Sequence, residues 1–397
     1  MPEEDIAVAT TIEVAEVRSE SRAARVAFVV GFLLLIGSIP LVQTAWELSH
    51  SEPVQVLEVL RSTPTAEGLA QYERAVEEHS VVGRQVRERW HWLSLVTLRA
   101  GNQKTVVGRG DSVFYRSSLD SAVAPGFMDH PEAEGHPVRA ITAFRDCLRE
   151  RGVELALLVA PGKEAIYPEW LSRRYREQDG PADNRDMPAF LDAMQRAGIT
   201  VVYPAEAMWR ARPGTLMYLK QDTHWTPEGM AVAADELEQA LDEDLHGSDG
   251  LTIRPLQVTC NGDLYDMLGL PSYLHAPLPC QSVTVQQVID AFGRPVEPDP
   301  QSPVVLLGDS FTNIYSLAEM GWGDHAGLGE QLALRLERRV DIIALNDGGV
   351  NSARATLVRR PDALSGKRLV IWQFAARDLV VKNGEWEIIE IAGGQRG

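Results

Sequence analysis

Two short segments of the sequence carry residue types that work together in nucleophilic catalysis. In the first, residues 304–312, an apolar run ends abruptly in Gly308-Asp309-Ser310. The run predicts a buried parallel strand, and Gly308 allows a sharp turn at its end. Ser310 then lies just past the carboxyl end of the strand, where open α/β sheets bind their ligands. A serine hydroxyl does not ionise at neutral pH, so this nucleophile needs a base within hydrogen-bonding reach and a third group that orients the base.

The base is predicted in the second segment, Gln221-Asp222-Thr223-His224-Trp225. An Asp two residues before a His can place both side chains on one side of an extended backbone. The carboxylate of Asp222 can then hold one imidazole nitrogen of His224 while the other nitrogen faces the serine. Thr226-Pro227 follows as an N-cap and first helical residue, so the pair lies on a loop just before a helix. We therefore predict that Ser310, His224 and Asp222 form a catalytic triad.

The elements that must position these residues follow from the apolar pattern after about residue 137. Strands are predicted at 153–159, 199–203, 340–345 and 369–374, and helices at 188–197 and 332–338. Strands that alternate with helices of this length predict an α/β fold, in which a mostly parallel sheet is flanked by helices and joined by right-handed crossovers. Residues 245–300 are rich in Pro and Gly and predict an insertion or lid-like excursion.

A second Gly-Asp-Ser triplet, residues 110–112, competes with the first for the role of nucleophile. It lies between two strand-like runs, residues 105–107 and 113–115. A Gly-Asp pair between two such runs is typical of a hairpin turn. We therefore interpret this triplet as a turn and assign the nucleophile to Ser310.

Composition limits the classes of partner. The chain has 397 residues, 45% of them apolar, with a formal net charge of −18 and a pI of about 5.0. This length allows one large domain or two ordinary ones. The negative charge argues against nucleic acid as a nonspecific partner but leaves open an anionic substrate in a local basic cleft. Two arginine groups could supply positive charge or lie on solvated helix faces: Arg173, Arg174 and Arg176, and Arg335, Arg338 and Arg339.

The N-terminal region contains an almost wholly apolar run, residues 27–42, with Arg18, Arg22 and Arg25 before it and Trp46 after it. A buried core helix and a cleaved signal peptide are the alternatives to a membrane span. The purity of the run and the arginines on one side favour a single-pass anchor in the inner membrane, with a cytoplasmic N-terminus and the remaining chain periplasmic or otherwise extracytoplasmic. We expect a cytoplasmic tail at 1–25, the anchor at 26–46, a helical stem at 47–79 and the catalytic domain at 80–397.

The three cysteines, Cys147, Cys260 and Cys280, leave at least one thiol unpaired. Cys147 is expected to be a buried thiol in an amphipathic helix. Cys260 and Cys280 flank one excursion and could form a disulfide in an oxidising compartment. The sequence has no Cys/His cluster with zinc spacing and no Gly-rich phosphate loop, so we expect no metal or other cofactor.

The two catalytic segments, Gly308-Asp309-Ser310-Phe311 and Asp222-Thr223-His224-Trp225, resemble those of the SGNH hydrolase-like domain of the alginate O-acetyltransferases AlgJ and AlgX. In ordinary SGNH esterases the serine block comes first, whereas here the order is reversed, as in the alginate family. The N-terminal anchor makes the chain more similar to AlgJ than to AlgX. Weaker similarities extend over roughly residues 80–390. They include Ala160-Pro161-Gly162-Lys163, Asn261-Gly262-Asp263-Leu264 and Arg377-Asp378-Leu379.

The resemblance implies acetyl transfer to an exported polysaccharide such as alginate, through an acetyl group on Ser310. His224 would act as the base and Asp222 would orient it. The oxyanion would be held by the Ser310 amide and one more donor, for which Asn313, Tyr315 and the turn at Asn346 are the candidates. Lys163, Arg377 and Trp225 could line the sugar site, or could be surface charges and a core residue. The resemblance also implies a multi-pass membrane O-acyltransferase that supplies the acetyl groups.

Two other functions are compatible with the same residues. The first is an SGNH carbohydrate acetylesterase, because the same triad hydrolyses an acetyl-serine if water replaces the sugar hydroxyl. The second is a noncatalytic scaffold that binds polysaccharide or positions a membrane acyltransferase. The presence of all three triad residues in two separate segments argues against the scaffold.

Overall fold

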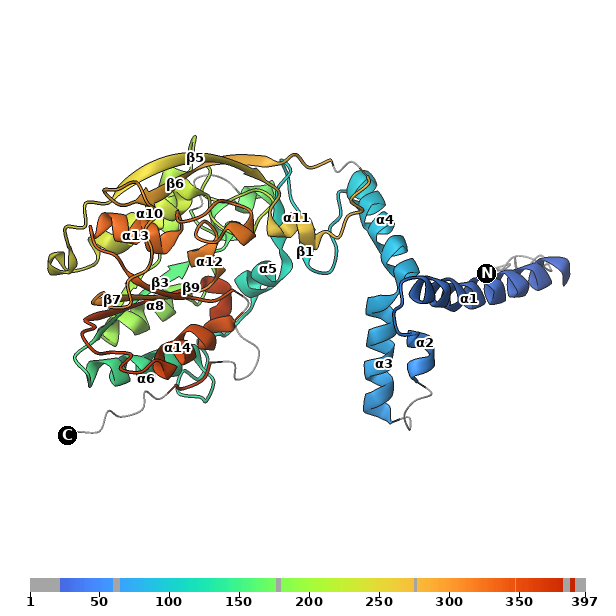
Figure 1. The fold of residues 1–397 in the computed structure, drawn as a ribbon, viewed down its shortest axis with the longest axis horizontal. Helices are drawn as coiled ribbons and strands as arrows, with labels where there is room; N and C mark the ends of the chain where they lie inside the picture. The colour runs from blue at the N-terminus through green and yellow to red at the C-terminus, as the bar shows by residue number, and fades with distance from the viewer. Residues whose placement is uncertain are drawn as a thin grey trace, which may run out of the picture. The chain divides into compact units, whose positions relative to one another are not determined.

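The computed structural model describes residues 22–59, 65–175, 180–274, 277–346, 348–380 and 386–389. The chain divides into two compact units, Met1–Arg89 and Trp90–Gly397. The division falls within the helix α4 (Val81–Leu98). The three predicted triad residues all belong to the second unit, which contains the parallel sheet (Figure 1).

The sheet of the second unit has five strands, all paired in parallel, in the order β4-β3-β9-β7-β8. The strands are β3 (Glu154–Ala160), β4 (Thr200–Val202), β7 (Val304–Gly308), β8 (Asp341–Ala344) and β9 (Leu369–Ala375). The mostly parallel sheet predicted from the sequence is confirmed. Because all five strands run the same way, their carboxyl ends meet at one edge, and Ser310 follows β7 at that edge.

Helices cover both faces of the sheet, so successive residues of its strands are buried on opposite sides (Figure 1). Leu306 and Ile371 pack in one core with α10 (Pro227–Gln239) and α13 (Leu328–Arg335). Leu307 and Trp372 pack in the other with α6 (Pro137–Arg149), α8 (Met187–Arg196) and α14 (Gly349–Arg359). The two cores fix β7 and β9, and hence the segments that follow them, from both sides.

Two antiparallel strand pairs lie outside the central sheet. The hairpin of β1 (Thr105–Val107) and β2 (Val113–Tyr115) confirms the turn predicted for the second Gly-Asp-Ser triplet, and Gly110 and Asp111 have positive φ there. Residues 245–300, predicted as an excursion, contain the long ribbon of β5 (Thr252–Cys260) and β6 (Gln281–Ile289). The helix α11 (Asp263–Met267) begins just after β5. All three cysteines are free thiols, Cys147 being half-buried, so the disulfide considered for Cys260 and Cys280 is not formed.

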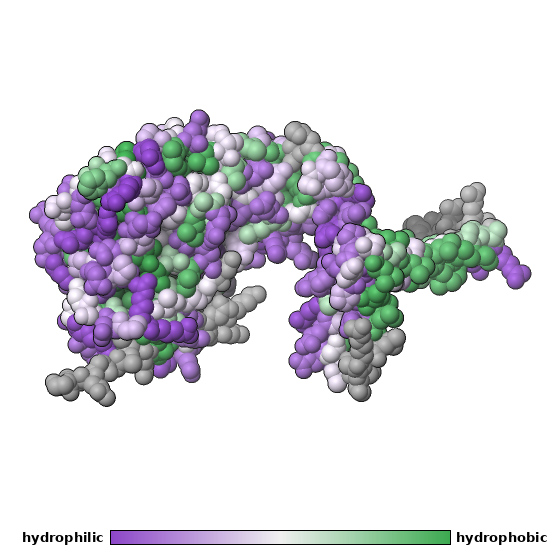
Figure 2. All heavy atoms as spheres, in the orientation of Figure 1, coloured by the Kyte–Doolittle hydropathy of each residue, from purple (hydrophilic) through white to green (hydrophobic). Residues whose placement is uncertain are grey.

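The first unit contains α1 (Arg22–Ser49), the one helix among the described residues that is long and apolar enough to cross a membrane. Its apolar side chains are exposed, as the green surface of Figure 2 shows, and Leu34 and Leu41 are among the most exposed. A helix that is apolar all round and exposed to solvent is typical of a membrane span rather than of a soluble core. The helices α2 (Gln55–Glu58) and α3 (Ala66–His79) follow it. The predicted cytoplasmic tail lies almost wholly outside the described residues.

Short helices connect the remaining parts of the second unit. They are α5 (Arg116–Val123), α7 (Lys163–Ile166), η1 (Pro168–Trp170), α9 (Ala205–Ala211), η3 (Glu243–Leu245), α12 (Ser310–Asn313), η4 (Ala318–Met320) and η5 (Ala376–Leu379).

Candidate active site

Ser310 is the first residue of α12, directly after the turn that ends β7. Asp309 caps this helix, because its carboxylate accepts a hydrogen bond from the backbone N–H of Phe311 at 2.8 Å. Gly308 is required by a close approach: a Cβ atom at this position would lie 2.1 Å from Oγ1 of Thr312. The Gly-Asp-Ser order therefore supplies a tight turn, a helix cap and a half-buried nucleophile in three consecutive residues.

His224 lies on the loop before α10, as the sequence predicts. Thr226 caps α10 by accepting a hydrogen bond from the N–H of Gly229 at 3.0 Å, and Pro227 begins the helix. The backbone of the loop is fixed by the N–H of Leu219, which donates to the carbonyl of His224 at 3.1 Å. The imidazole is 3% exposed and packs edge-on against the ring of Phe311.

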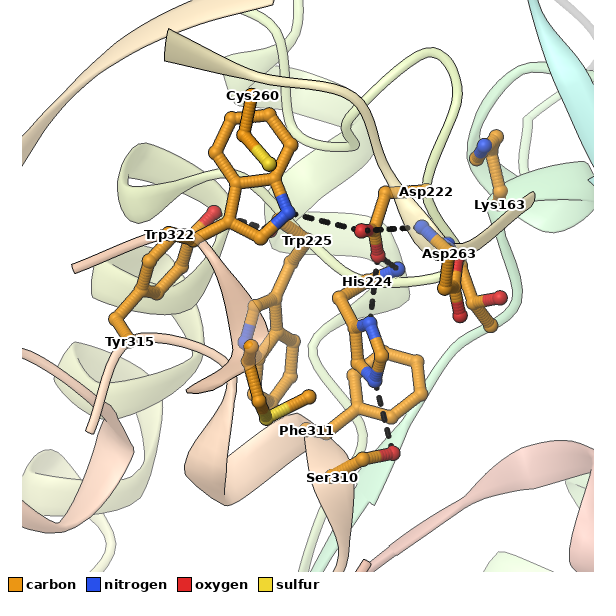
Figure 3. Close-up of polar contacts among 12 residues, drawn as sticks. Lys163, Asp222, His224, Trp225, Cys260, Asp263, Ser310, Phe311, Tyr315 and Trp322 are labelled. Atoms are coloured by element: carbon orange, nitrogen blue, oxygen red, sulfur yellow. Dashed lines mark hydrogen bonds and ion pairs between the residues drawn. The ribbon is translucent and has the colours of Figure 1, made fainter. Parts of the chain in front are cut away.

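The structure brings Asp222, His224 and Ser310 together in one hydrogen-bonded chain (Figure 3). Nδ1 of His224 lies 2.6 Å from Oδ1 of Asp222, and Nε2 lies 2.8 Å from Oγ of Ser310. This is the arrangement in which an imidazole held by a carboxylate takes the proton of a serine hydroxyl.

Burial and charge act in opposite directions on the two titrating residues of this chain. Burial alone would raise the pKa of Asp222, but the neighbouring His224 and the hydrogen bonds that the carboxylate accepts outweigh it and lower the pKa. Burial is the largest single effect on the pKa of His224 and lowers it, but the charge and hydrogen bond of Asp222 together with the charge of Asp263 outweigh burial and raise the pKa above the ordinary value of 6.5. Asp222 therefore remains ionised while His224 is a stronger base than a free imidazole.

A pocket of about 160 Å³ opens beside Ser310 at the carboxyl edge of the sheet. Gly308, Ser310 and the start of α14 line it, together with Gln373 and Arg377 from β9 and η5. The Nε2 atom of Gln373 is buried, while its Oε1 atom accepts hydrogen bonds from the Asp309 N–H and the Thr312 hydroxyl. Because the pocket has a volume of about 160 Å³ and Ser310 lines it, it can hold a small acyl group against the nucleophile.

The three residues considered as oxyanion donors are placed differently. Tyr315 is fully buried, and its hydroxyl donates to the carbonyl of Trp225 at 2.8 Å. Nδ2 of Asn313 donates to Oδ1 of Asn346 at 3.0 Å, and Nδ2 of Asn346 lies 3.5 Å from the sulfur of Met320. The amides of Asn313 and Asn346 thus contact each other and Met320, whereas Gly348 and Gly349 of the following turn line the pocket beside Ser310.

The three residues considered for the sugar site also lie in different environments. Trp225 is fully buried and packs edge-on against Phe311, behind the triad. Lys163 is buried, and its ammonium group donates to the carbonyls of Val113 and Lys220 at 2.7 and 3.1 Å. Arg377 alone of the three lines the pocket beside Ser310.

The arginine groups considered for an anionic polymer are partly used by the fold. Arg335 donates to Oδ1 of Asp235 at 2.6 Å, and Arg338 donates to the carbonyl of Leu245 at 2.8 Å. Arg173 and Arg174 are exposed, while Arg176 lies outside the described residues.

Two residues that contact Asp222 were not predicted as site residues. Nε1 of Trp322 donates to Oδ2 of Asp222 at 2.9 Å, and the backbone N–H of Asp263 donates to the same oxygen at 3.1 Å (Figure 3). Nothing in the sequence pattern around Trp322 points to this role. Asp263 lies in the Asn-Gly-Asp stretch that contributed to the family resemblance, which was the available signal.

Ligand atoms of Asp222, His224 and Asp263 lie within 4.8 Å of one another, a spacing that could surround a metal ion. Both oxygens of Asp222 already accept hydrogen bonds, two of them from His224, and Oδ1 of Asp263 accepts one from the N–H of Thr223. This cluster is thus built as a hydrogen-bonded triad, and we assign no metal to it.

Known proteins are similar to this chain in sequence. A protein named "Probable alginate O-acetylase AlgJ" from Pseudomonas putida is 29% identical over 259 residues, which are 61% of this chain and 63%, or less than two thirds, of that relative. The protein of the same name from Pseudomonas aeruginosa is 24% identical over 374 residues, 91% of each chain.

Two solved structures have the same fold. The O-acetyltransferase domain of Pseudomonas putida AlgJ matches with a TM-score of 0.54 and 25% identity, over 70% of this chain and 93% of that domain. Pseudomonas aeruginosa AlgX matches with a TM-score of 0.52 and 18% identity, over 68% of this chain and 62% of that one. Residues 114–376 match the family described as "SGNH hydrolase-like domain, acetyltransferase AlgX". Because this match covers more than half of the sequence, the chain belongs to the AlgX family of SGNH hydrolase-like domains.

Proposed function

We propose that this protein is an O-acetyltransferase that moves acetyl groups to hydroxyls of an exported polysaccharide. The observation that carries the proposal is the unbroken chain of hydrogen bonds from Asp222 through His224 to Ser310, with separations of 2.6 and 2.8 Å. The names of the relatives, alginate O-acetylases, support an acetyl group as the group transferred and a polysaccharide as the acceptor.

The reaction proceeds in two half-reactions at Ser310. In the first, Oγ attacks the carbonyl carbon of an acetyl donor while Nε2 of His224 takes the hydroxyl proton, and the donor group leaves with that proton. In the second, a sugar hydroxyl gives its proton to Nε2 and attacks the acetyl-serine, and Oγ of Ser310 leaves and regains the proton. Asp222 stabilises the imidazolium that forms in each half-reaction.

The negative oxygen of each tetrahedral intermediate needs donors in the pocket beside Ser310. We assign the backbone N–H of Ser310 as one donor and an N–H at the start of α14 as the second, because Gly348 and Gly349 line that pocket. The N–H groups of the first helical turn have no partner within the helix, so they can donate to an anion. Removing one such donor typically costs about 3–4 kcal/mol of transition-state stabilisation.

The acceptor binds in a groove that adjoins the pocket beside Ser310. The groove has a volume of about 700 Å³, and Arg377 and Asp378 line both spaces. Lys104 and Arg116 add two exposed positive charges to the groove, and Tyr115 adds an aromatic ring. The groove thus carries three cations and two carboxylates, those of Asp120 and Asp378, so its net charge is positive although the whole chain has a net charge of −18. A positive groove favours a polymer that carries negative charge.

The protein works at a membrane surface. The apolar helix α1 supports a single-pass anchor, and Arg22 and Arg25 at its start favour a cytoplasmic N-terminus with the catalytic unit outside the inner membrane. An extracytoplasmic transferase needs acetyl groups that have crossed the membrane, so a membrane-bound O-acyltransferase is the partner that supplies them. A reporter fused after residue 50 should be active outside the cytoplasm; cytoplasmic reporter activity would overturn this orientation.

The proposed activity is tested with the full-length protein in detergent and p-nitrophenyl acetate as the acetyl donor. Wild type should release p-nitrophenol, and Ser310→Ala should reduce the release to background. With polyuronate oligosaccharides present, the products should include acetylated oligosaccharide. Free acetate alone, at every acceptor tested, would favour an esterase. Equal release by wild type and Ser310→Ala would contradict the triad and favour the scaffold.

A further inference from the structure

The carboxylate of Asp222 is held by more groups than the triad itself requires. Oδ1 accepts from Nδ1 and from the backbone N–H of His224, at 2.6 and 3.0 Å. Oδ2 accepts from Nε1 of Trp322 at 2.9 Å and from the N–H of Asp263 at 3.1 Å. The last two donors come from segments far along the chain, so the orientation of Asp222 depends on how those segments are fixed.

Asp263 and the loop that carries Asp222 bind each other in both directions. While the N–H of Asp263 donates to Asp222, Oδ1 of Asp263 accepts from the N–H of Thr223 at 2.7 Å. The N–H of Tyr265 also donates to the carbonyl of Gln221 at 3.1 Å. The start of α11 thus contacts three consecutive residues of the catalytic loop.

Gly262 makes this contact possible. A Cβ atom at this position would lie 2.3 Å from Cβ of Asp222 and 2.3 Å from the carbonyl oxygen of Gln221. Real atoms cannot approach so closely, so the Gly-Asp pair is shaped to the backbone of the loop. This brings a second carboxylate, that of Asp263, beside Asp222 and His224, where their ligand atoms lie within 4.8 Å of one another.

Two carboxylates this close repel each other and favour the uptake of a proton. A cation near this pair is Lys163, which Figure 3 places on the same side of Asp222 as Asp263, away from Ser310. Its ammonium group is buried and donates to the carbonyl of Lys220, two residues before Asp222, and to the carbonyl of Val113. Lys163 therefore both ties the catalytic loop to β2 and places a positive charge near the carboxylate pair.

We propose that Asp263 and Lys163 are positioning residues that hold Asp222 and balance the charge around His224: the carboxylate of Asp263 favours the imidazolium, and the ammonium group of Lys163 opposes it. This inference rests on the proposed function. Neither residue touches the reacting atoms; both act through Asp222 and the loop that carries it.

The electrostatics of the cluster support this assignment. Burial lowers the pKa of Lys163, and Asp222, Asp263 and Glu164 partly oppose that shift. Burial and the charge of Asp222 raise the pKa of Asp263, which its proximity to His224 opposes. Asp222 and Asp263 both act to raise the pKa of His224, while Arg377 acts to lower it. The charges of Asp222 and Asp263 thus act on both His224 and Lys163.

The test is the pH at which His224 loses its activity as a base, measured as kcat/KM for p-nitrophenyl acetate with the full-length protein. Asp263→Asn keeps the side chain's shape but removes a negative charge, so the midpoint of the acidic limb should fall by roughly 0.5–1 pH unit. Lys163→Met removes a positive charge, so the midpoint should rise by a similar amount. The double variant should return the midpoint toward that of wild type.

Asp266→Asn is the matched control, because Asp266 lies on the same helix but is exposed, and its carboxylate interacts with the charge of Asp222 rather than with His224 itself. Its midpoint should move much less than that of Asp263→Asn. Equal shifts in these two variants would overturn the inference, and so would unchanged midpoints. The midpoint is the deciding quantity because a loss of folded protein lowers the rate without moving the midpoint. If Lys163→Met does not fold, the comparison of Asp263→Asn with Asp266→Asn still decides. If the midpoints overturn this inference while p-nitrophenol release still depends on Ser310, the proposed function remains supported.

Discussion

The Oγ atom of Ser310 lies 2.8 Å from Nε2 of His224, although 86 positions separate the two residues in the chain. The serine follows the central strand β7, and the histidine lies on the loop before α10, which packs on one face of the sheet. Their contact therefore depends on the fold of the whole second unit rather than on local sequence. Four consequences of this geometry can be measured.

Asp222→Asn should leave the fold intact and remove most of the activity. The amide cannot stabilise the imidazolium, and its NH2 group can favour the wrong tautomer of His224. We expect kcat for p-nitrophenyl acetate to fall by on the order of 10³–10⁴-fold. Thermal denaturation measured by circular dichroism serves as the control for folding. A loss of less than tenfold in a folded variant would show that Asp222 does not orient the base.

The activity should decline in acid at a higher pH than a free histidine would give. His224 must be unprotonated to act as the base. Burial lowers its pKa, but Asp222 and Asp263 together outweigh burial and raise the pKa above 6.5. A raised pKa means that protonation, and hence inactivation, begins at a higher pH. The acidic midpoint of kcat/KM should therefore lie above 6.5 in wild type.

Asp222→Asn removes the main effect that opposes burial at His224, so the residual activity should have a midpoint below that of wild type. A wild-type midpoint below 6.5, or one that does not move in this variant, would contradict the assignment of His224.

Gly308→Ala should destabilise the protein and displace the nucleophile. The new Cβ atom would lie 2.1 Å from Oγ1 and 2.7 Å from Cβ of Thr312, so α12 must shift. Overpacking of this kind costs about 1–3 kcal/mol of unfolding free energy. Chemical denaturation measures the loss. Thr312→Ala removes the contact with Oγ1 but leaves Cβ of residue 312 at 2.7 Å. In combination with it, the total loss should be somewhat smaller than the sum of the single losses; a simple sum would show that the contact is relieved in another way.

Arg377→Gln should weaken acceptor use more than it weakens acetyl release in water. Arg377 lines both the pocket beside Ser310 and the groove assigned to the acceptor. Loss of a charged hydrogen bond of about 1.5–3 kcal/mol corresponds to an increase of roughly 10–150-fold in KM for a polyuronate oligosaccharide. Arg196→Gln on α8 is the control, since that exposed side chain pairs with Asp192 and lines neither space. Equal KM values for the two variants would remove Arg377 from the acceptor site.

Much of the fold could be predicted because its signals are local. The apolar run of β7 with Gly308 after it, and the Thr226-Pro227 start of α10, each follow from short-range rules that hold in the structure. The hairpin turn at Gly110 and Asp111 was separated from the true Ser310 turn by the same reasoning. The ribbon of β5 and β6 was missed as regular structure, because twenty intervening residues from 261 to 280 hide the pairing of the two strands.

The surroundings of the triad could not be predicted, because they depend on contacts between distant segments. The sequence does not show that Trp322, a hundred positions from Asp222, donates to its carboxylate. Nor does it show that the hydroxyl of Tyr315 donates to the carbonyl of Trp225, or that Lys163 donates to backbone carbonyls. For such residues, the residue type and the neighbouring sequence indicate that the side chain is polar, but not where it points or which group it contacts.

The most direct test of the central claim is mass spectrometry of the peptide that contains Ser310, after the full-length protein is mixed with an acetyl donor and quenched in acid. The account predicts a peptide heavier by one acetyl group on Ser310, which disappears when a polysaccharide acceptor is added before the quench and is absent in Ser310→Ala. An acetyl group that forms equally in His224→Ala, or on a residue other than Ser310, would contradict it.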